Sequence, residues 1–158
     1  MEEDVRHEEE IERWIRDDIA RKNPKTGISV CPYAAKTVET KAFHILRGKS
    51  DLVAQIGHCC DLIGVLGLDI VIIYIQYKIT EKQLRRLCRQ AHKNNSHYAI
   101  MYDHPENTGL HRGVSFSYQK TPLVMIQDLN TLKDAQSKLQ RTAYYRTWGL
   151  DDCDDMFY

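Results

Sequence analysis

The chain has 158 residues, of which 42% are hydrophobic and 28% charged, which predicts one globular domain and excludes disorder of the whole chain. Its 22 basic and 22 acidic side chains give a net charge of zero, which excludes a basic protein that coats nucleic acid over its whole surface. The longest apolar run, Ile70–Ile75, is far shorter than the roughly 18 residues of a membrane helix, so we expect no membrane association.

The first predicted element is a helix over residues 8–22, where apolar residues recur at helical spacing. A strand follows over residues 40–46. The next helix begins at Ser50, a favourable N-cap, and its apolar stripe ends near Gly64. The segment Asp69–Gln76 is nearly all apolar and β-branched, which predicts a central strand covered on both faces of the sheet.

The second half of the chain predicts two more helices and three more strands. Thr80 and Gln83 fit a capping box for a helix that extends to about residue 93. The remaining elements are strands over residues 97–102, 114–118 and 123–127, the last two paired as a hairpin around residues 119–121, and a helix from Asn130 to about Tyr145.

These elements predict an α/β fold in the order α-β-α-β-α-β-β-β-α, with α+β as the alternative. Helices between the first three strands imply parallel crossovers, and the later hairpin gives a mixed sheet of about five strands with helices packed against it. We expect residues 1–148 to form a single domain and residues 149–158 to form an acidic C-terminal tail.

Basic charge is concentrated in residues 78–100, which carry six basic and one acidic side chain. The side chains that the predicted helix places off its apolar stripe are Lys82, Arg85, Arg86, Arg89 and Lys93. Such a face suits phosphates or an acidic partner, and the alternative is an ordinary solvated helix face. Binding of nucleic acid here would be helped by basic residues of the last helix, namely Lys133, Lys138, Arg141 and Arg146.

Cys31 is the first candidate for chemistry, because it lies in a loop rather than in a helical stripe, next to Pro32. An exposed loop thiol near a base or a helix N-terminus is reactive as the thiolate. The alternative is a small buried hydrophobe under the loop, since cysteine is among the most buried residue types.

The second candidate is the segment that follows the strand over residues 97–102. His104 suits an acid or base near neutral pH, and Asp103 or Glu106 would orient it. Open α/β sheets often place ligand-binding groups after strands. The alternative is a simple turn, which needs the same Asp, Pro and Asn residues.

Five cysteines are an odd number and three fall in helical patterns, so we expect no disulfide framework and a cytoplasmic location. The segment His58–Asp61 brings two cysteines next to a histidine, but neighbouring residues of a helix point about 100° apart, and no second ligand pair has zinc spacing. No nucleotide-binding motif occurs. We therefore expect neither a metal nor a cofactor.

The acidic tail is the feature that core packing explains least. Four aspartates precede the terminal residues Met156, Phe157 and Tyr158. Repulsion between the carboxylates keeps such a tail extended, and its end supplies an apolar anchor for a basic-rimmed pocket of a partner protein or for the chain's own basic helix. The alternative is a disordered tail without function.

Three motifs of the chain resemble a family of small uncharacterised bacterial proteins. After a helix that contains Trp14, the segment Val30–Ala34 is similar to that family's Cys-Pro-aromatic-Ala motif. His104-Pro105 is similar to its His-Pro after a strand, and Thr121–Ile126 to its Ser-Pro-led strand before the last helix, although the loop between these two is shorter here. The resemblance covers residues 11–140. It implies a fold and a cysteine–histidine pair, but no reaction.

Three functions follow from these observations, and the resemblance favours the first of them. The first is a small-ligand or enzymatic site in which Cys31 is the nucleophile or redox thiol and His104 the base, supported by Asp103 or Glu106; it requires a sulfur-to-nitrogen distance of about 3–5 Å. The second is a non-enzymatic adaptor that binds a protein partner through its acidic tail and basic helix. The third is nucleic-acid binding through the basic helix, and whether the protein is an enzyme stays open.

Overall fold

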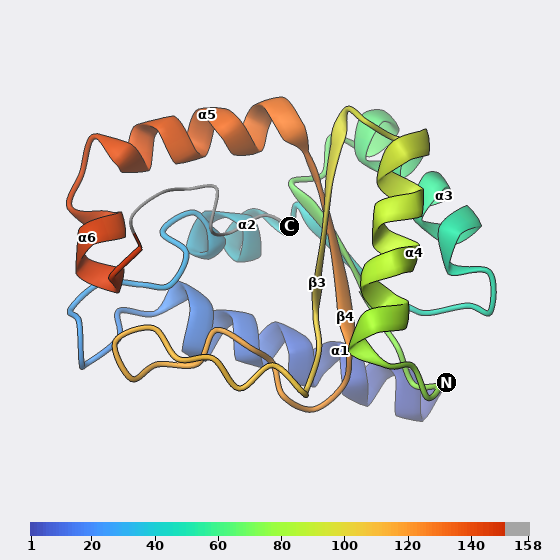
Figure 1. Cartoon of the computed structure of the whole chain (residues 1–158), viewed down its shortest axis with the longest axis horizontal. Coiled ribbons are helices and arrows are strands. Elements are labelled where there is room, and N and C mark those ends of the chain that lie inside the picture. The colour runs from blue at the N-terminus through green and yellow to red at the C-terminus, as the bar shows by residue number, and fades with distance from the viewer. Residues whose placement is uncertain (151–158) are drawn as a thin grey trace. The chain divides into compact units, whose positions relative to one another are not determined.

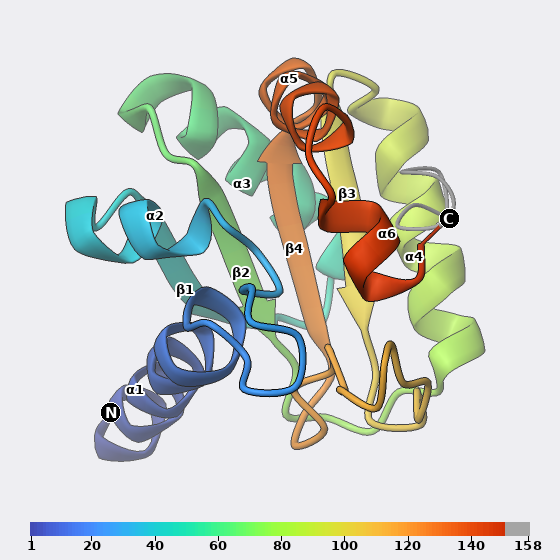
Figure 2. The same cartoon turned by 90° about the vertical axis from the view of Figure 1, so that its left-hand side faces the viewer.

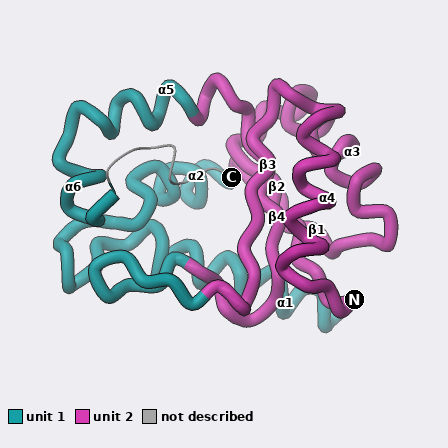
Figure 3. The backbone as a smooth tube through the Cα atoms, in the orientation of Figure 1, with its two compact units in different colours: residues 1–41, 108–116, 133–158 teal, residues 42–107, 117–132 magenta. Residues whose placement is uncertain are grey.

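The computed structural model describes residues 1–150. It divides the chain into two compact units, shown in different colours in Figure 3. Unit 1 contains residues 1–41, 108–116 and those from 133 onward, and unit 2 contains residues 42–107 and 117–132. The single domain expected over residues 1–148 stays a prediction.

Unit 2 contains a four-stranded mixed sheet, which confirms the predicted α/β fold with one strand fewer than expected. Its strands are β1 (Phe43–Arg47), β2 (Ile70–Tyr74), β3 (Tyr98–Asp103) and β4 (Leu123–Asp128). Their order is β1-β2-β4-β3, as Figure 2 shows. β1 and β2 are parallel, whereas β4 is antiparallel to both β2 and β3. The sheet therefore has edges at β1 and β3.

Helices α3 (Leu52–Leu66) and α4 (Glu81–Asn94) cover one face of this sheet (Figure 1). Because side chains alternate along a strand, Val71 and Ile73 of β2 point into the core beneath these helices. Ile72 and Tyr74 point to the opposite face and are also buried. The prediction of a central strand buried on both faces is confirmed.

Side-chain caps begin both helices. Thr80 and Gln83 form the predicted capping box, with bonds of 2.9 and 3.1 Å between each side chain and the other residue's backbone N–H. At the start of α3, Asp51 and not Ser50 is the N-cap, and its carboxylate accepts the N–H of Ala54 at 3.1 Å.

Unit 1 is largely helical. Its elements are α1 (Glu2–Trp14), a π-helix η1 (Ile15–Ala20), α2 (Ala34–Thr40), α6 (Tyr144–Trp148) and most of α5 (Leu129–Gln140). Its core gathers Tyr144 and Trp148 of α6 around Val30. Trp148 Nε1 donates to the carbonyl of Ser29 at 3.2 Å, and the Tyr144 hydroxyl donates to that of Val30. The segment before Cys31 is thus held by α6.

The predicted strand over residues 114–118 does not form, so the predicted hairpin is wrong, and β4 pairs with β2 and β3 instead. Arg112 and Gly113 both have positive φ, and the resulting tight turn gives only an isolated bridge between His111 and Val114. The alternating apolar residues of this segment pack individually. For example, the ring centroid of Phe116 lies 4.9 Å from that of Trp148.

The helices also differ from the predictions in three respects. α1 begins at Glu2 instead of residue 8, and α2 was not predicted. The last helix is split into α5 and α6, because the Thr142 hydroxyl donates to the Leu139 carbonyl and accepts the N–H of Tyr144, which ends one helix and begins the next. Within residues 1–150, no helix has the length and apolar character needed to cross a bilayer.

Candidate functional site

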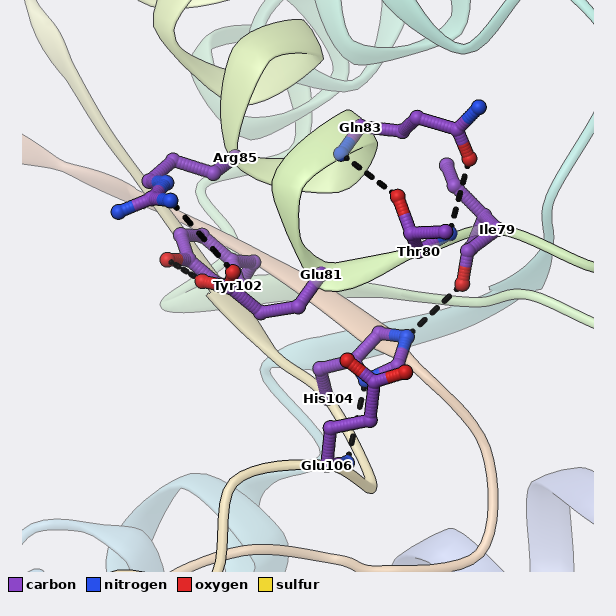
Figure 4. Close-up of polar contacts among 8 residues, drawn as sticks. All are labelled: Ile79, Thr80, Glu81, Gln83, Arg85, Tyr102, His104 and Glu106. Atoms are coloured by element: carbon purple, nitrogen blue, oxygen red, sulfur yellow. Dashed lines mark hydrogen bonds and ion pairs between the residues drawn. The ribbon is translucent and has the colours of Figure 1, made fainter.

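His104 lies directly after β3 and ties this strand end to the start of α4 (Figure 4). The ring is 6% exposed. Its Nε2 lies 2.8 Å from the carbonyl oxygen of Ile79, which only accepts, and its Nδ1 lies 3.1 Å from the backbone N–H of Glu106, which only donates. These two bonds require the neutral ring protonated at Nε2. Both nitrogens are therefore engaged with the backbone.

Asp103 and Glu106, the predicted supports of the histidine, have different roles. Asp103 is 7% exposed, and its Oδ2 accepts the N–H of Tyr118 at 2.7 Å, so it anchors the segment before β4. Burial raises the pKa of Asp103, opposed by the hydrogen bond from Tyr118. Glu106 is exposed, with its Oε2 3.9 Å from Nδ1 of His104.

Cys31 belongs to unit 1, whereas His104 belongs to unit 2, so neither unit by itself contains both members of the predicted pair. The backbone N–H of Cys31 donates to the carbonyl of Ile19 at 3.0 Å. Burial raises the pKa of the Cys31 thiol, against the opposing effect of the backbone N–H groups of Tyr33 and Ala34. A raised pKa favours the neutral thiol, which is the less reactive form. A common site for the pair stays a prediction.

The loop between β1 and α3, residues 48–51, is also held by internal hydrogen bonds. The buried side chain of Gln55 accepts the N–H of Lys49 and donates to the carbonyl of Arg47, both at 2.8 Å. Together with the Asp51 cap, these bonds use polar groups that such loops otherwise offer to ligands.

The exposed face of α4 differs from these strand ends and loops, because most of its charged side chains have no partner among residues 1–150. Lys82, Arg86, Arg89 and Lys93 are all exposed and follow one another at helical spacings of four, three and four residues. We call these four residues the basic stripe. Within residues 1–150, no carboxylate pairs with any of them. At 1.5 Å per residue, the basic stripe extends over about 16 Å.

Arg85, the fifth predicted cation of this helix, stands apart from the basic stripe. Its guanidinium lies 3.6 Å from Oε2 of Glu81, the acidic residue in the first turn of α4 (Figure 4). Oε1 of Glu81 accepts the hydroxyl of Tyr102 at 2.6 Å. The i,i+4 spacing of Glu81 and Arg85 is readable in the sequence, but nothing there indicates Tyr102.

α4 is held rigidly beneath the basic stripe. Its inner residues Leu84, Cys88 and Ala91 are almost fully buried in the core of unit 2. The capping box fixes its first turn, and the Asn95 side chain donates to the carbonyl of Ala91 at 2.9 Å at its other end. The charges are therefore presented on a fixed scaffold.

Among residues 1–150, the remaining predicted residues form no second cluster. Lys133, Lys138, Arg141 and Arg146 belong to unit 1, and Lys138 lies 3.0 Å from Asp134. In α3, burial raises the pKa of Cys59 to about 11 and that of Cys60 to about 12. Among residues 1–150, no three His, Cys, Asp or Glu side chains are grouped to hold a metal ion. Met156, Phe157 and Tyr158 lie outside the described residues.

Comparisons of the chain with protein-family profiles, curated proteins and solved structures found no match. The resemblance to a bacterial family therefore stays a prediction.

Proposed function

We propose that the protein uses the basic stripe of α4 to bind the phosphate backbone of nucleic acid. One observation carries the proposal: four exposed cations stand in a line on a rigid helix, and no described carboxylate neutralises them. Lysine and arginine that contact phosphates release condensed counterions, and this release drives binding without any contact to the bases.

The adaptor function is less well supported by this surface. Protein interfaces have an apolar or aromatic centre and few charges there. The exposed large hydrophobic residues among residues 1–150 include none of α4, whose apolar side chains point into the core. A row of cations without an apolar anchor suits phosphates better than it suits an acidic protein segment.

An enzymatic site around Cys31 and His104 is also less well supported. The hydrogen bonds of His104 leave no ring nitrogen free to accept a substrate proton. The raised pKa of Cys31 leaves less thiolate at neutral pH. The described polar groups at these positions are used by the fold itself.

The test compares the wild-type protein with a variant in which the four residues of the basic stripe are replaced by glutamine. Affinity for a short labelled DNA duplex is measured by fluorescence anisotropy at several salt concentrations. Four phosphate contacts predict that log K falls with log salt with a slope of about −3.6. We expect the variant to lose about 100-fold or more in affinity, since each removed contact costs on the order of 1 kcal/mol.

Arg85→Gln is the matched control, because Arg85 lies on the same helix but pairs with Glu81. We expect it to bind within about twofold of wild type, since an exposed ion pair contributes little. Absent duplex binding by the wild-type chain, or equal binding by the stripe variant, would refute the proposed function.

A further inference from the structure

We infer that the basic stripe selects double-stranded over single-stranded nucleic acid and reads no sequence. This inference rests on the proposed function and specifies the form of its partner. It follows from three properties of unit 2: the aromatic residues that the surface lacks, the rigidity of the helix, and the density of its charge.

Single-strand binding depends on aromatic side chains on which unpaired bases stack. The basic stripe consists of lysine and arginine alone. On the same helix, the ring of His92 is tied through Nδ1 to the carbonyl of Tyr98 at 3.0 Å. Tyr102 is partly buried and bonded to Glu81. His92 is itself exposed, so α4 presents one imidazole ring and no row of stacking sites.

Among the tyrosine, phenylalanine and tryptophan residues of unit 2, Tyr77 is the most exposed, at 38%. It lies in the loop before α4, and its hydroxyl donates to the carbonyl of Lys49 at 3.1 Å. A single ring outside the stripe does not provide a row of stacking sites. It does supply a control position, because a single-strand binder would depend on it.

The rigidity of α4 favours a partner whose charges are equally fixed. Its inner face is buried and both ends are bonded, so the backbone positions that carry the four cations keep a constant spacing over about 16 Å. A duplex holds its phosphates at fixed positions and carries one negative charge per about 1.7 Å of axis, about twice the density of one strand. A single strand must lose conformational freedom to match the same array.

Phosphate contacts fix the position of a protein on the duplex but carry no sequence information. Arginine also reads guanine in the major groove, but the contacts proposed for Arg86 and Arg89 are to phosphates. We therefore expect the same affinity for duplexes of unrelated sequence.

The experiment measures competition for the labelled duplex by four unlabelled probes: the same duplex, either of its separated strands, a duplex of scrambled sequence, and a poly-aspartate peptide. We expect both duplexes to compete equally and the single strands at least about tenfold more weakly. Tyr77→Leu should leave the affinity for the duplex within about twofold of wild type.

The outcomes separate this inference from the proposed function. If single strands compete as well as the duplex and Tyr77→Leu weakens their binding, the inference is overturned while the proposed function stands. If sequence changes affinity tenfold, the claim of no sequence reading is overturned. If the labelled duplex does not bind, both proposals fail, and direct binding of a labelled poly-aspartate peptide would then assign the surface to acidic protein segments.

Discussion

The end of β3 and the outer face of α4 are both rich in polar side chains. Those at the end of β3 are bonded within the fold, whereas those on α4 face solvent. At the end of β3, Asp103 and His104 are buried and bonded to the backbone of other segments. On α4, the cations of the basic stripe are exposed and unpaired among residues 1–150. A histidine or carboxylate after a strand indicates a binding site only when its hydrogen bonds are not already made by the fold. Four predictions test this contrast.

The largest expected effect is that of His104→Ala on stability. The substitution removes the partners of the Ile79 carbonyl and the Glu106 N–H, so the free energy of unfolding should fall by about 2 kcal/mol, since each of these two partly buried hydrogen bonds contributes about 1 kcal/mol. Urea denaturation followed by circular dichroism measures this. Glu106→Gln, at an exposed position, should change it by less than about 0.5 kcal/mol. Equal effects of the two changes would show that His104 is not a structural link.

The second prediction concerns Cys31. Because burial raises the pKa of its thiol, we expect alkylation by iodoacetamide at pH 8 to be at least about tenfold slower in the folded chain than in urea. Mass spectrometry of the peptide that contains Cys31 gives the two rates. Faster alkylation in the folded chain would instead identify an activated thiol and support an enzymatic site at Cys31.

The third prediction is a change in affinity without a change in stability. Arg86→Gln should weaken duplex binding by about three- to tenfold and reduce the salt slope by about 1, because one phosphate contact is lost. The urea midpoint should not move, since Arg86 is exposed and has no ion pair within residues 1–150. A loss of stability similar to that of His104→Ala would place Arg86 in the structural group.

The smallest expected effect is the dependence of the free energy of unfolding on pH that Asp103 introduces. Burial raises its pKa in the folded state, so the folded chain holds this proton more tightly than the unfolded chain. The protonated Asp103 side chain stabilises the folded state fully when the pH is below the pKa of an unfolded aspartate, about 4. This stabilisation is lost as the pH rises through the raised pKa of Asp103 in the folded state. Asp103→Asn, which cannot ionise, should flatten this part of the stability profile while its amide oxygen still accepts the N–H of Tyr118. An unchanged profile in the variant would exclude Asp103 as its origin.

Local signals in the sequence predicted much of unit 2. The β-branched run of β2 and the capping box of Thr80 and Gln83 depend on neighbouring residues, and both are confirmed. The strand order and the fate of residues 114–118 depend on partners far along the chain, and alternation alone does not specify them.

The candidate site divides in the same way. Helical spacing was enough to predict the basic face of α4, and the i,i+4 rule separates Arg85 from it. The bond between His104 and Ile79 joins residues 25 positions apart, so no local pattern could show that the histidine is engaged. The sequence therefore indicated which polar residues to consider, but not which of them are already hydrogen-bonded within the fold.

The chain crosses between the two units four times, after residues 41, 107, 116 and 132, and the last crossing falls inside α5. Neither unit is a continuous stretch of polypeptide, so no simple truncation isolates the part that carries α4. A ribosome completes the sheet only after residues of both units have been made, because β4 follows the 108–116 segment in the chain.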